Sequence, residues 1–117
     1  MMSHIILSKD QSYSTVKEEA IKERFYNDFS VEDVDFAKPL LVPESSSHFL
    51  TPTSVTDEKF GRIPRMYISC LHDKAISPSI QKQMYSNLPC QRIIEMESGH
   101  APFFSAPKEL SRHLLSI

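Results

Sequence analysis

Two side chains that can share a proton-transfer reaction follow two short apolar runs in the second half of the chain. Asp73 comes just after the run 66–71, and His100 follows the run 93–96. Each run has the length and the apolar character of a buried strand, and a helical pattern lies between them. Because the carboxyl ends of parallel strands meet at one edge of an open sheet, we expect Asp73 and His100 to lie close together.

An aspartate beside a histidine is the pairing that orients a general base in nucleophilic catalysis. The carboxylate holds the Nδ1–H group and fixes the tautomer, which leaves Nε2 free to take a proton from a nucleophile. One common chain order for such triads is nucleophile, acid, histidine, and Asp73 and His100 follow its last two terms. A plainer interpretation stays open, in which Asp73 binds backbone amides at the next helix start and His100 faces solvent.

The third member of such a triad, the nucleophile, is missing from the pattern. A serine on a sharp strand-to-helix turn needs Gly-x-Ser-x-Gly, and the only two glycines are Gly61 and Gly99. The same spacing excludes a glycine-rich phosphate loop. Cys70 lies inside an apolar run, where a thiol is usually an inert apolar group. We therefore expect the chain to carry an acid and a base without nucleophile or oxyanion hole, and to be inactive alone.

The remaining histidines are not spaced from other residues in a way that predicts a catalytic pair or a metal site. Strand alternation turns His72 away from Asp73, and His4, His48 and His113 stand alone. No His, Cys and carboxylate spacing is typical of a metal site, so we expect no metal and no cofactor.

The elements around the Asp-His pair indicate parallel winding. Ser77 is the expected N-cap of a helix with Pro78 in its first turn and Pro89 after its end. A last helix begins near 106–109. The expected inner faces of these two helices are formed by Ile80, Met84, Tyr85 and Leu88 and by Leu110, Leu114 and Ile117. Strand, helix, strand, helix is the order of a βαβ unit with a parallel sheet.

The first half of the chain predicts two short helices and a linker. Thr15 and Glu18 fit a capping box, and Ser30 is the expected N-cap of the second helix. The apolar faces of these helices would be formed by Val16, Ala20, Ile21 and Phe25 and by Val34, Ala37, Leu40 and Leu41. Residues 42–64 show no period and are punctuated by proline and serine. The apolar residues of this linker, Phe49, Leu50, Val55 and Phe60, indicate that it packs against something.

Composition narrows the class of protein. The 117 residues carry a net charge of −2 with mixed signs, which favours neither nucleic acid nor a membrane surface as a partner. The apolar run 5–7 is too short for a signal peptide or a membrane span. Cys70 and Cys90 fit reduced thiols, which favours a cytoplasmic location. Two parallel strands leave edges and faces open, so we expect part of a larger fold, a partner that completes the sheet, or self-association.

Two segments resemble a known family. Residues 60–76 and 99–110 are similar to the C-terminal part of the α/β-hydrolases that include plant methylesterases, hydroxynitrile lyases and their microbial relatives. In that family an Arg-x-Tyr-Ile strand ends in the triad aspartate, and a glutamine-containing helix follows, which Gln81 matches. A Ser-x-Pro-x-Glu-Leu helix start follows the triad histidine, and residues 105–110 match it. The resemblance covers residues 25–117, and residues 30–34 resemble the end of the helical lid.

The resemblance implies an α/β protein, a C-terminal fragment of an α/β-hydrolase fold. It would have two parallel strands with flanking helices in residues 60–117, and lid-derived helices with a linker in residues 1–59. It implies that Asp73 is the triad acid and His100 the triad base of an esterase with a small-molecule ester substrate. The lyase branch has a lysine after the histidine; Ala101 stands there and favours the esterase side.

Two other interpretations stay open at this point. One is a non-catalytic pseudo-enzyme or interaction module that docks through an open sheet edge. The other is a truncated product with no role.

Overall fold

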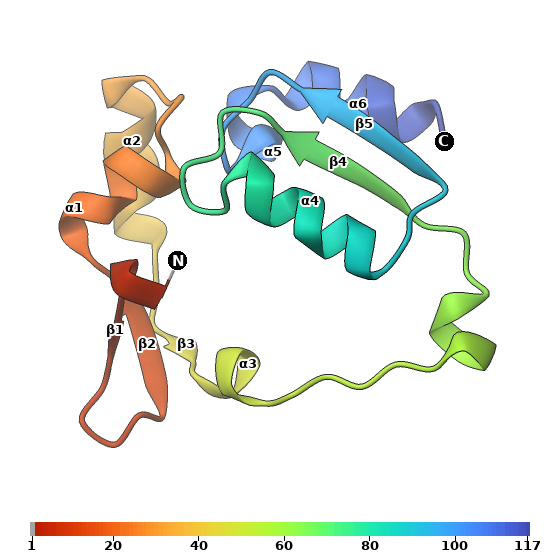
Figure 1. The fold of residues 1–117 in the computed structure, drawn as a ribbon. Helices are drawn as coiled ribbons and strands as arrows, with labels where there is room; N and C mark the ends of the chain where they lie inside the picture. Colours follow the sequence, from red (N-terminus) through yellow and green to blue (C-terminus); the bar gives the residue numbers. More distant parts are fainter. Residues whose placement is uncertain (1) are drawn as a thin grey trace.

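The computed structural model describes residues 2–117 as two small sheets, joined by helices and a long connecting segment (Figure 1). The elements of the first half are η1 (Met2–His4), β1 (Ile5–Leu7), β2 (Tyr13–Val16), α1 (Glu18–Ala20), η2 (Ile21–Phe25), α2 (Val31–Ala37), η3 (Lys38–Leu40), β3 (Glu44–Ser45) and α3 (Ser47–Leu50). The second half contains η4 (Asp57–Gly61), β4 (Met66–Cys70), α4 (Pro78–Asn87), β5 (Arg92–Met96), α5 (Pro102–Ser105) and α6 (Pro107–Leu115). Here η1 and η3 are 3-10 helices, and η2 and η4 are single π-helical turns.

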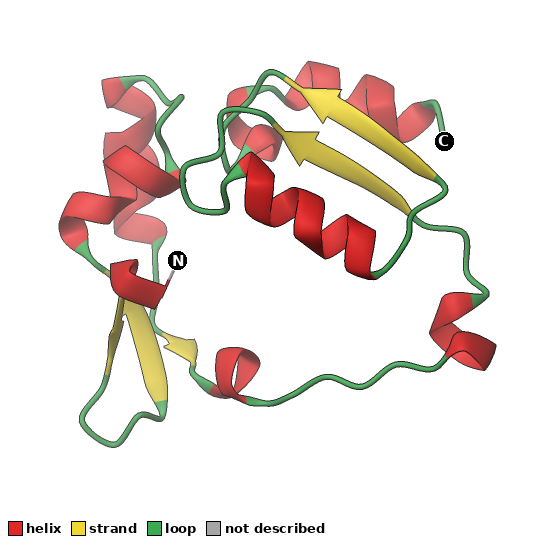
Figure 2. Ribbon diagram, viewed as in Figure 1, coloured by secondary structure: helices red, strands yellow, loops and turns green. Residues whose placement is uncertain are grey.

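The second half winds as a βαβ unit, which confirms the predicted parallel pairing. Strands β4 and β5 run parallel, with Met66 opposite Arg92 and Cys70 opposite Met96. The pairing continues past the strands, because His72 N–H donates to Ser98 O at 2.9 Å. In Figure 2, α4 lies in front of this sheet, and α5 and α6 lie behind it. The two loops that follow the strands therefore leave the sheet at the same edge.

Helix α4 begins and ends where the sequence predicts, but its buried side is different. Ser77 Oγ accepts the Ile80 N–H, Pro78 is in the first turn, and the helix ends before Pro89. The fully buried residue is Gln81, at 2% exposure, and not the apolar positions. Three of the four residues expected inside are exposed (Ile80, Met84 and Leu88). The polar Gln81 faces the sheet because its amide binds backbone groups there.

The N-terminal residues form a hairpin and not the start of a helix. Strands β1 and β2 are antiparallel, with Ile6 opposite Thr15 and Ile5 opposite Val16. The expected N-cap at Thr15 is therefore wrong, and α1 begins at Glu18 with no side-chain cap. β-Branched residues such as these favour a pleated, paired strand, and their backbone groups are used by the hairpin.

The buried core joins the helices of the first half to the segment after β5. Phe29, Val34 and Ala37 pack with Ala101, and Tyr26 and Phe104 lie against them. Ser30 Oγ accepts the Asp33 N–H at 3.1 Å, which confirms the predicted cap of α2. Of the predicted apolar face, Val34 and Ala37 are buried, but Leu40 and Leu41 are exposed. The helix changes at Lys38 into the 3-10 helix η3, which contains Pro39.

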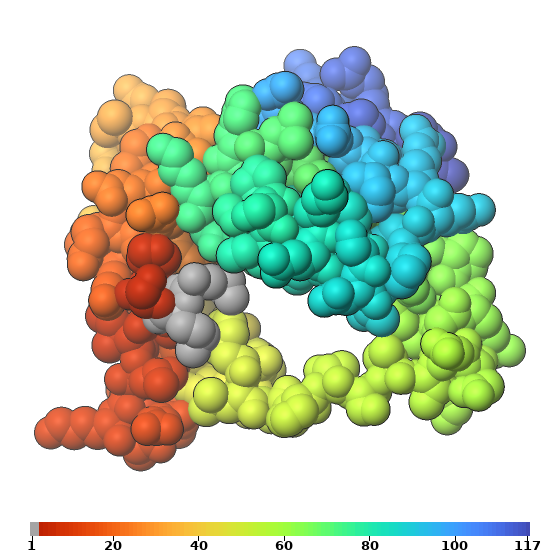
Figure 3. Space-filling view, in the orientation of Figure 1, coloured from red at the N-terminus to blue at the C-terminus, as the bar shows by residue number. Residues whose placement is uncertain are grey.

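The connecting segment between α3 and β4 stands apart from the rest. The linker residues expected to pack, Phe49 and Leu50 in α3 and Val55 and Phe60 in this segment, are all exposed. Figure 3 shows this segment running around an opening below α4. The Cα radius of gyration is 15.9 Å, against about 13 Å for a compact domain of this length. The described residues therefore do not close around one core. No helix within residues 2–117 is long and apolar enough to span a bilayer.

Candidate active site

Asp73 is held in the turn after β4 by the backbone that follows it. Its side chain is buried, and Oδ1 accepts the N–H groups of Ala75 and Ile76 at 2.8 and 2.9 Å. These two bonds occupy one carboxylate oxygen and fix the side chain's orientation. The interpretation in which Asp73 binds backbone amides before α4 is therefore correct for one oxygen.

The second carboxylate oxygen binds His100. Asp73 Oδ2 lies 2.9 Å from His100 Nδ1, which confirms the predicted contact and excludes a histidine turned away from Asp73. An ionised carboxylate only accepts hydrogen bonds, so this contact fits the neutral tautomer of His100 that has its proton on Nδ1 and a free lone pair on Nε2. The side chain of His100 is 30% exposed and that of Asp73 is 6% exposed. The buried Asp73 thus holds Nδ1 of the partly exposed His100, and Nε2 takes no part in this contact.

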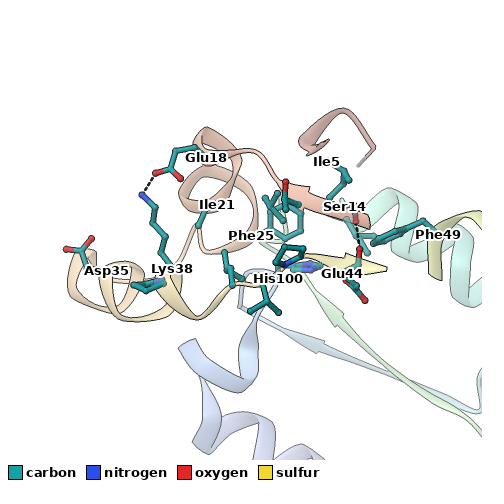
Figure 4. A pocket seen from close by; sticks show the side chains of 17 residues that line it. Ile5, Ser14, Glu18, Ile21, Phe25, Asp35, Lys38, Glu44, Phe49 and His100 are labelled. Atoms are coloured by element: carbon teal, nitrogen blue, oxygen red, sulfur yellow. Dashed lines mark hydrogen bonds and ion pairs between the residues drawn. The ribbon is translucent and has the colours of Figure 1, made fainter. Parts of the chain in front are cut away.

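An apolar hollow lies beside His100. It has a volume of 910 Å³ and is bounded by the hairpin, α1, η2 and the chain between α2 and α3 (Figure 4). The rings of Phe25 and His100 pack in a T-shaped arrangement, with centroids 5.2 Å apart and planes at 89°. The Glu18–Lys38 ion pair lies among its lining residues and neutralises two of its charges. A smaller hollow of 220 Å³ also meets His100 and includes Ala101 and Phe103.

Gln81 ties both ends of the Asp73 turn together. Its Oε1 accepts Cys70 N–H at 2.9 Å, while Nε2 donates to Cys70 O at 2.9 Å and to Ile76 O at 2.8 Å. Cys70 ends β4 and Ile76 ends the turn, so this one buried amide fixes the distance across it. Hydrophobic patterning could not find this role; the matched glutamine of the family resemblance was the only sign of it.

The other candidate residues take no part in the hydrogen bond between Asp73 and His100. Burial raises the pKa of the Cys70 thiol, which disfavours its thiolate and agrees with an inert cysteine. Each of three histidines pairs with a glutamate elsewhere: His72 with Glu97, His48 with Glu44 and His113 with Glu109. The last two pairs have i,i+4 spacing, which the sequence could have revealed. Within residues 2–117, no group of three or more His, Cys, Asp or Glu could hold a metal ion.

Comparisons with known proteins point in one direction. No protein-family model matches the sequence. Methylesterase 2 from Arabidopsis thaliana is 38% identical over 102 residues, covering 83% of this chain and 38% of that protein. Methyl jasmonate esterase 1 from Vitis vinifera is 32% identical over 103 residues, covering 85% of this chain and 40% of that protein.

Solved structures agree on the fold. An Arabidopsis methylesterase matches with a TM-score of 0.76 and 29% identity, over 90% of this chain and 45% of that chain. The chain is similar to the C-terminal part of the methylesterase-like α/β-hydrolases. A pyrethroid hydrolase from Sphingobium faniae shares the fold, with a TM-score of 0.82 and 24% identity over 98% of this chain and 47% of that chain. This methylesterase-like chain is consistent with the C-terminal part of the fold, and it spans about two fifths of the curated relatives' length.

Proposed function

We propose that this chain supplies the acid and the base of a Ser-His-Asp triad in a carboxylic-ester hydrolase. The observation that carries the proposal is the 2.9 Å contact between Asp73 Oδ2 and His100 Nδ1. Two backbone amides hold the other carboxylate oxygen, so the acid is oriented before any substrate arrives. Such an oriented pair is what a general base at a nucleophile requires.

The proposed reaction follows from the tautomer of His100. Nε2 takes the hydroxyl proton of a serine while the serine oxygen attacks the ester carbonyl. Nε2 then gives that proton to the oxygen of the leaving alcohol. Water then attacks the acyl carbon while Nε2 takes its proton, the bond to the serine oxygen breaks, and Nε2 returns the proton to that oxygen as the acid leaves. Asp73 stays ionised and stabilises the imidazolium that forms. The sequence has no Gly-x-Ser-x-Gly, so the serine and the oxyanion hole would come from outside these residues.

The hollow beside His100 supports a small apolar ester as the substrate. Most of its side chains are apolar, and two of its charged groups pair with each other. The residue after the histidine, Ala101, is small and buried. Relatives named methylesterases favour a methyl ester, whose leaving alcohol is small. The acid part of the ester would occupy the larger hollow.

A chimaera tests this proposal. The chain replaces the matching segment of Arabidopsis Methylesterase 2, and hydrolysis of short p-nitrophenyl esters is measured. We expect hydrolysis that falls by at least about 10³-fold in His100→Ala, and that His113→Ala leaves unchanged because His113 lies on α6 beside Glu109. A folded chimaera that hydrolyses nothing, or one that His100→Ala leaves active, would overturn the proposal.

A second candidate function is that of a non-catalytic interaction module. Within the described residues, β4 and β5 pair only with each other, so each has one edge free. Such edges bind an added strand through main-chain hydrogen bonds. A folded chimaera without activity, together with tight binding of the isolated chain to a strand-forming partner, would favour this function over the triad.

A further inference from the structure

One turn of the first half contacts both loops that carry the proposed acid and base. The turn is formed by residues 26–29, between η2 and α2. We propose that its two polar residues, Asn27 and Asp28, are positioning residues that set the placement of Asp73 against His100. The inference rests on the proposed function, because it assigns these residues to the same Asp-His pair.

Asn27 holds the residue before Asp73. Its Nδ2 donates to His72 O at 2.9 Å, while His72 N–H donates to Ser98 O at 2.9 Å. Both backbone groups of His72 are therefore occupied, one by the neighbouring strand end and one by Asn27. The peptide that leads into Asp73 cannot rotate without breaking one of these bonds.

Asp28 holds the residue before His100. Its Oδ2 accepts Gly99 N–H at 2.7 Å and Ser105 Oγ–H at 2.8 Å. Gly99 directly precedes His100, and Ser105 ends the short helix α5 that follows it. One carboxylate oxygen thus ties the chain on both sides of His100.

The contact leaves no spare space. A Cβ at Gly99 would lie 2.5 Å from Asn27 Oδ1 and 2.7 Å from Asp28 Oδ1. Glycine is the residue that permits such a close approach of side-chain oxygens to the backbone. Neither polar side chain could come this near if position 99 carried any other residue.

The turn itself is anchored by aromatic packing. Tyr26 and Phe29 stack with centroids 4.4 Å apart, and Phe29 stacks on Phe104 at 4.6 Å. Phe29 is also part of the buried core. The turn therefore has a defined position relative to the segment after His100, and its two adjacent residues transmit that position to both loops.

Small errors in such a placement matter for catalysis. Catalytic side chains act only when neighbouring groups hold them in the productive geometry, and a misplacement of about 1 Å can cost a hundredfold in rate. Supporting hydrogen bonds of this kind orient the residues that touch substrate. Asn27 and Asp28 touch neither Asp73 nor His100 through the contacts above, so their effect would pass through His72 and Gly99.

The test follows one proton, the Nδ1–H of His100, by NMR of the purified chain. A proton held between this nitrogen and a carboxylate resonates far downfield and exchanges slowly with water. We expect Asn27→Ala, which removes one neutral hydrogen bond, to speed this exchange about fivefold. Asp28→Ala removes two hydrogen bonds to a carboxylate and should speed it by more than about tenfold. Ser105→Ala is the matched control: it removes one partner of Asp28 but keeps the bond to Gly99, and we expect a smaller effect.

Isosteric variants decide the outcome if the alanine variants do not fold. Asn27→Asp places an acceptor against His72 O and should speed the exchange, whereas Asp28→Asn keeps an oxygen for Gly99 N–H and should leave it near the original rate. Folded variants that all keep the original exchange rate would overturn the proposal. Absence of the downfield proton in the unmodified chain would instead contradict the Asp73–His100 pair, so the two failures are distinguishable.

Discussion

Gly99 and Asn27 approach so closely that no side chain fits at Gly99. A Cβ there would lie 2.5 Å from Asn27 Oδ1. Neither glycine of the described chain has a positive φ, so the requirement at position 99 is spatial and not conformational. Asn27 cannot swing aside without losing its bond to His72 O. The contact joins the first half of the chain to the residue before His100.

Replacing Gly99 by alanine should therefore destabilise the chain. The added methyl must push Asn27 and Asp28 away, and overpacking of this kind costs about 2 kcal/mol. Urea unfolding followed by circular dichroism measures the change. The matched control is Gly61→Ala in η4, where the nearest atom to a Cβ is Asp57 Oδ1 at 3.2 Å. We expect Gly61→Ala to cost less; equal effects would refute this explanation of Gly99.

Removing the amide of Gln81 should loosen the turn that carries Asp73. Gln81→Leu leaves the Cys70 N–H and the Ile76 carbonyl oxygen without partners, and it removes one of the two hydrogen bonds to the Cys70 carbonyl oxygen. Each buried group left without a partner costs about 1–3 kcal/mol. We expect the free energy of unfolding to fall by a large amount. Hydrogen exchange at the Cys70 amide measures how far the turn opens locally. The control is Gln83→Leu on the exposed side of α4, which should have little effect. A Gln81→Leu chain as stable as the control would show that the buried amide is dispensable.

The two cysteines should differ in reactivity. Burial raises the pKa of the Cys70 thiol, so less thiolate is present at a given pH, and the thiolate is the form that reacts. We expect iodoacetamide to modify the half-exposed Cys90 first in the folded chain, with Cys70 reacting only as the pH rises further. Peptide mass mapping after a short reaction at about pH 8, near the ordinary thiol pKa, measures this. In urea the two cysteines should react at equal rates. Equal rates of modification in the folded chain would contradict the expectation.

The isolated chain should self-associate. Within residues 2–117 both strands of the parallel sheet have a free edge, and Ile93 on β5 is exposed; open edges and apolar faces favour association. Light scattering should give a mass above 13.4 kDa, and Ile93→Lys should lower it. The control is Leu115→Lys at the exposed end of α6, which should leave the mass unchanged. A stable monomer with a sharp melt would contradict this expectation.

Sequence reasoning succeeded where local chemistry decides the structure. Ser30 and Ser77 cap their helices through their own side chains. The two apolar runs end shortly before Asp73 and His100, and this predicted that both residues follow the ends of strands. These features depend on a few neighbouring residues, and the parallel pairing of the two strands then brings the two side chains together.

Sequence reasoning failed where a distant segment decides the structure. Thr15 looks like a helix cap in isolation, but its pairing with Ile6 places it in a strand. Gln81 is buried because of backbone groups at Cys70 and Ile76, which no hydrophobic period reports. Asn27 and Asp28 have no local pattern, since their partners lie in two separate loops. Tyr85 of α4 packs against Tyr67 of β4, but no described element covers Ile80, Met84 and Leu88.

The most direct test of the proposed acid-base pair is the kcat of the chimaera with Asp73→Asn. Asparagine can still accept the amides of Ala75 and Ile76, but it would turn an NH₂ group toward His100 Nδ1. His100 would then carry its proton on Nε2 and could not act as a base. The account predicts that kcat falls by about 10⁴-fold while the fold is kept, as is typical of the wrong tautomer. A folded Asp73→Asn chimaera with an unchanged kcat would contradict it.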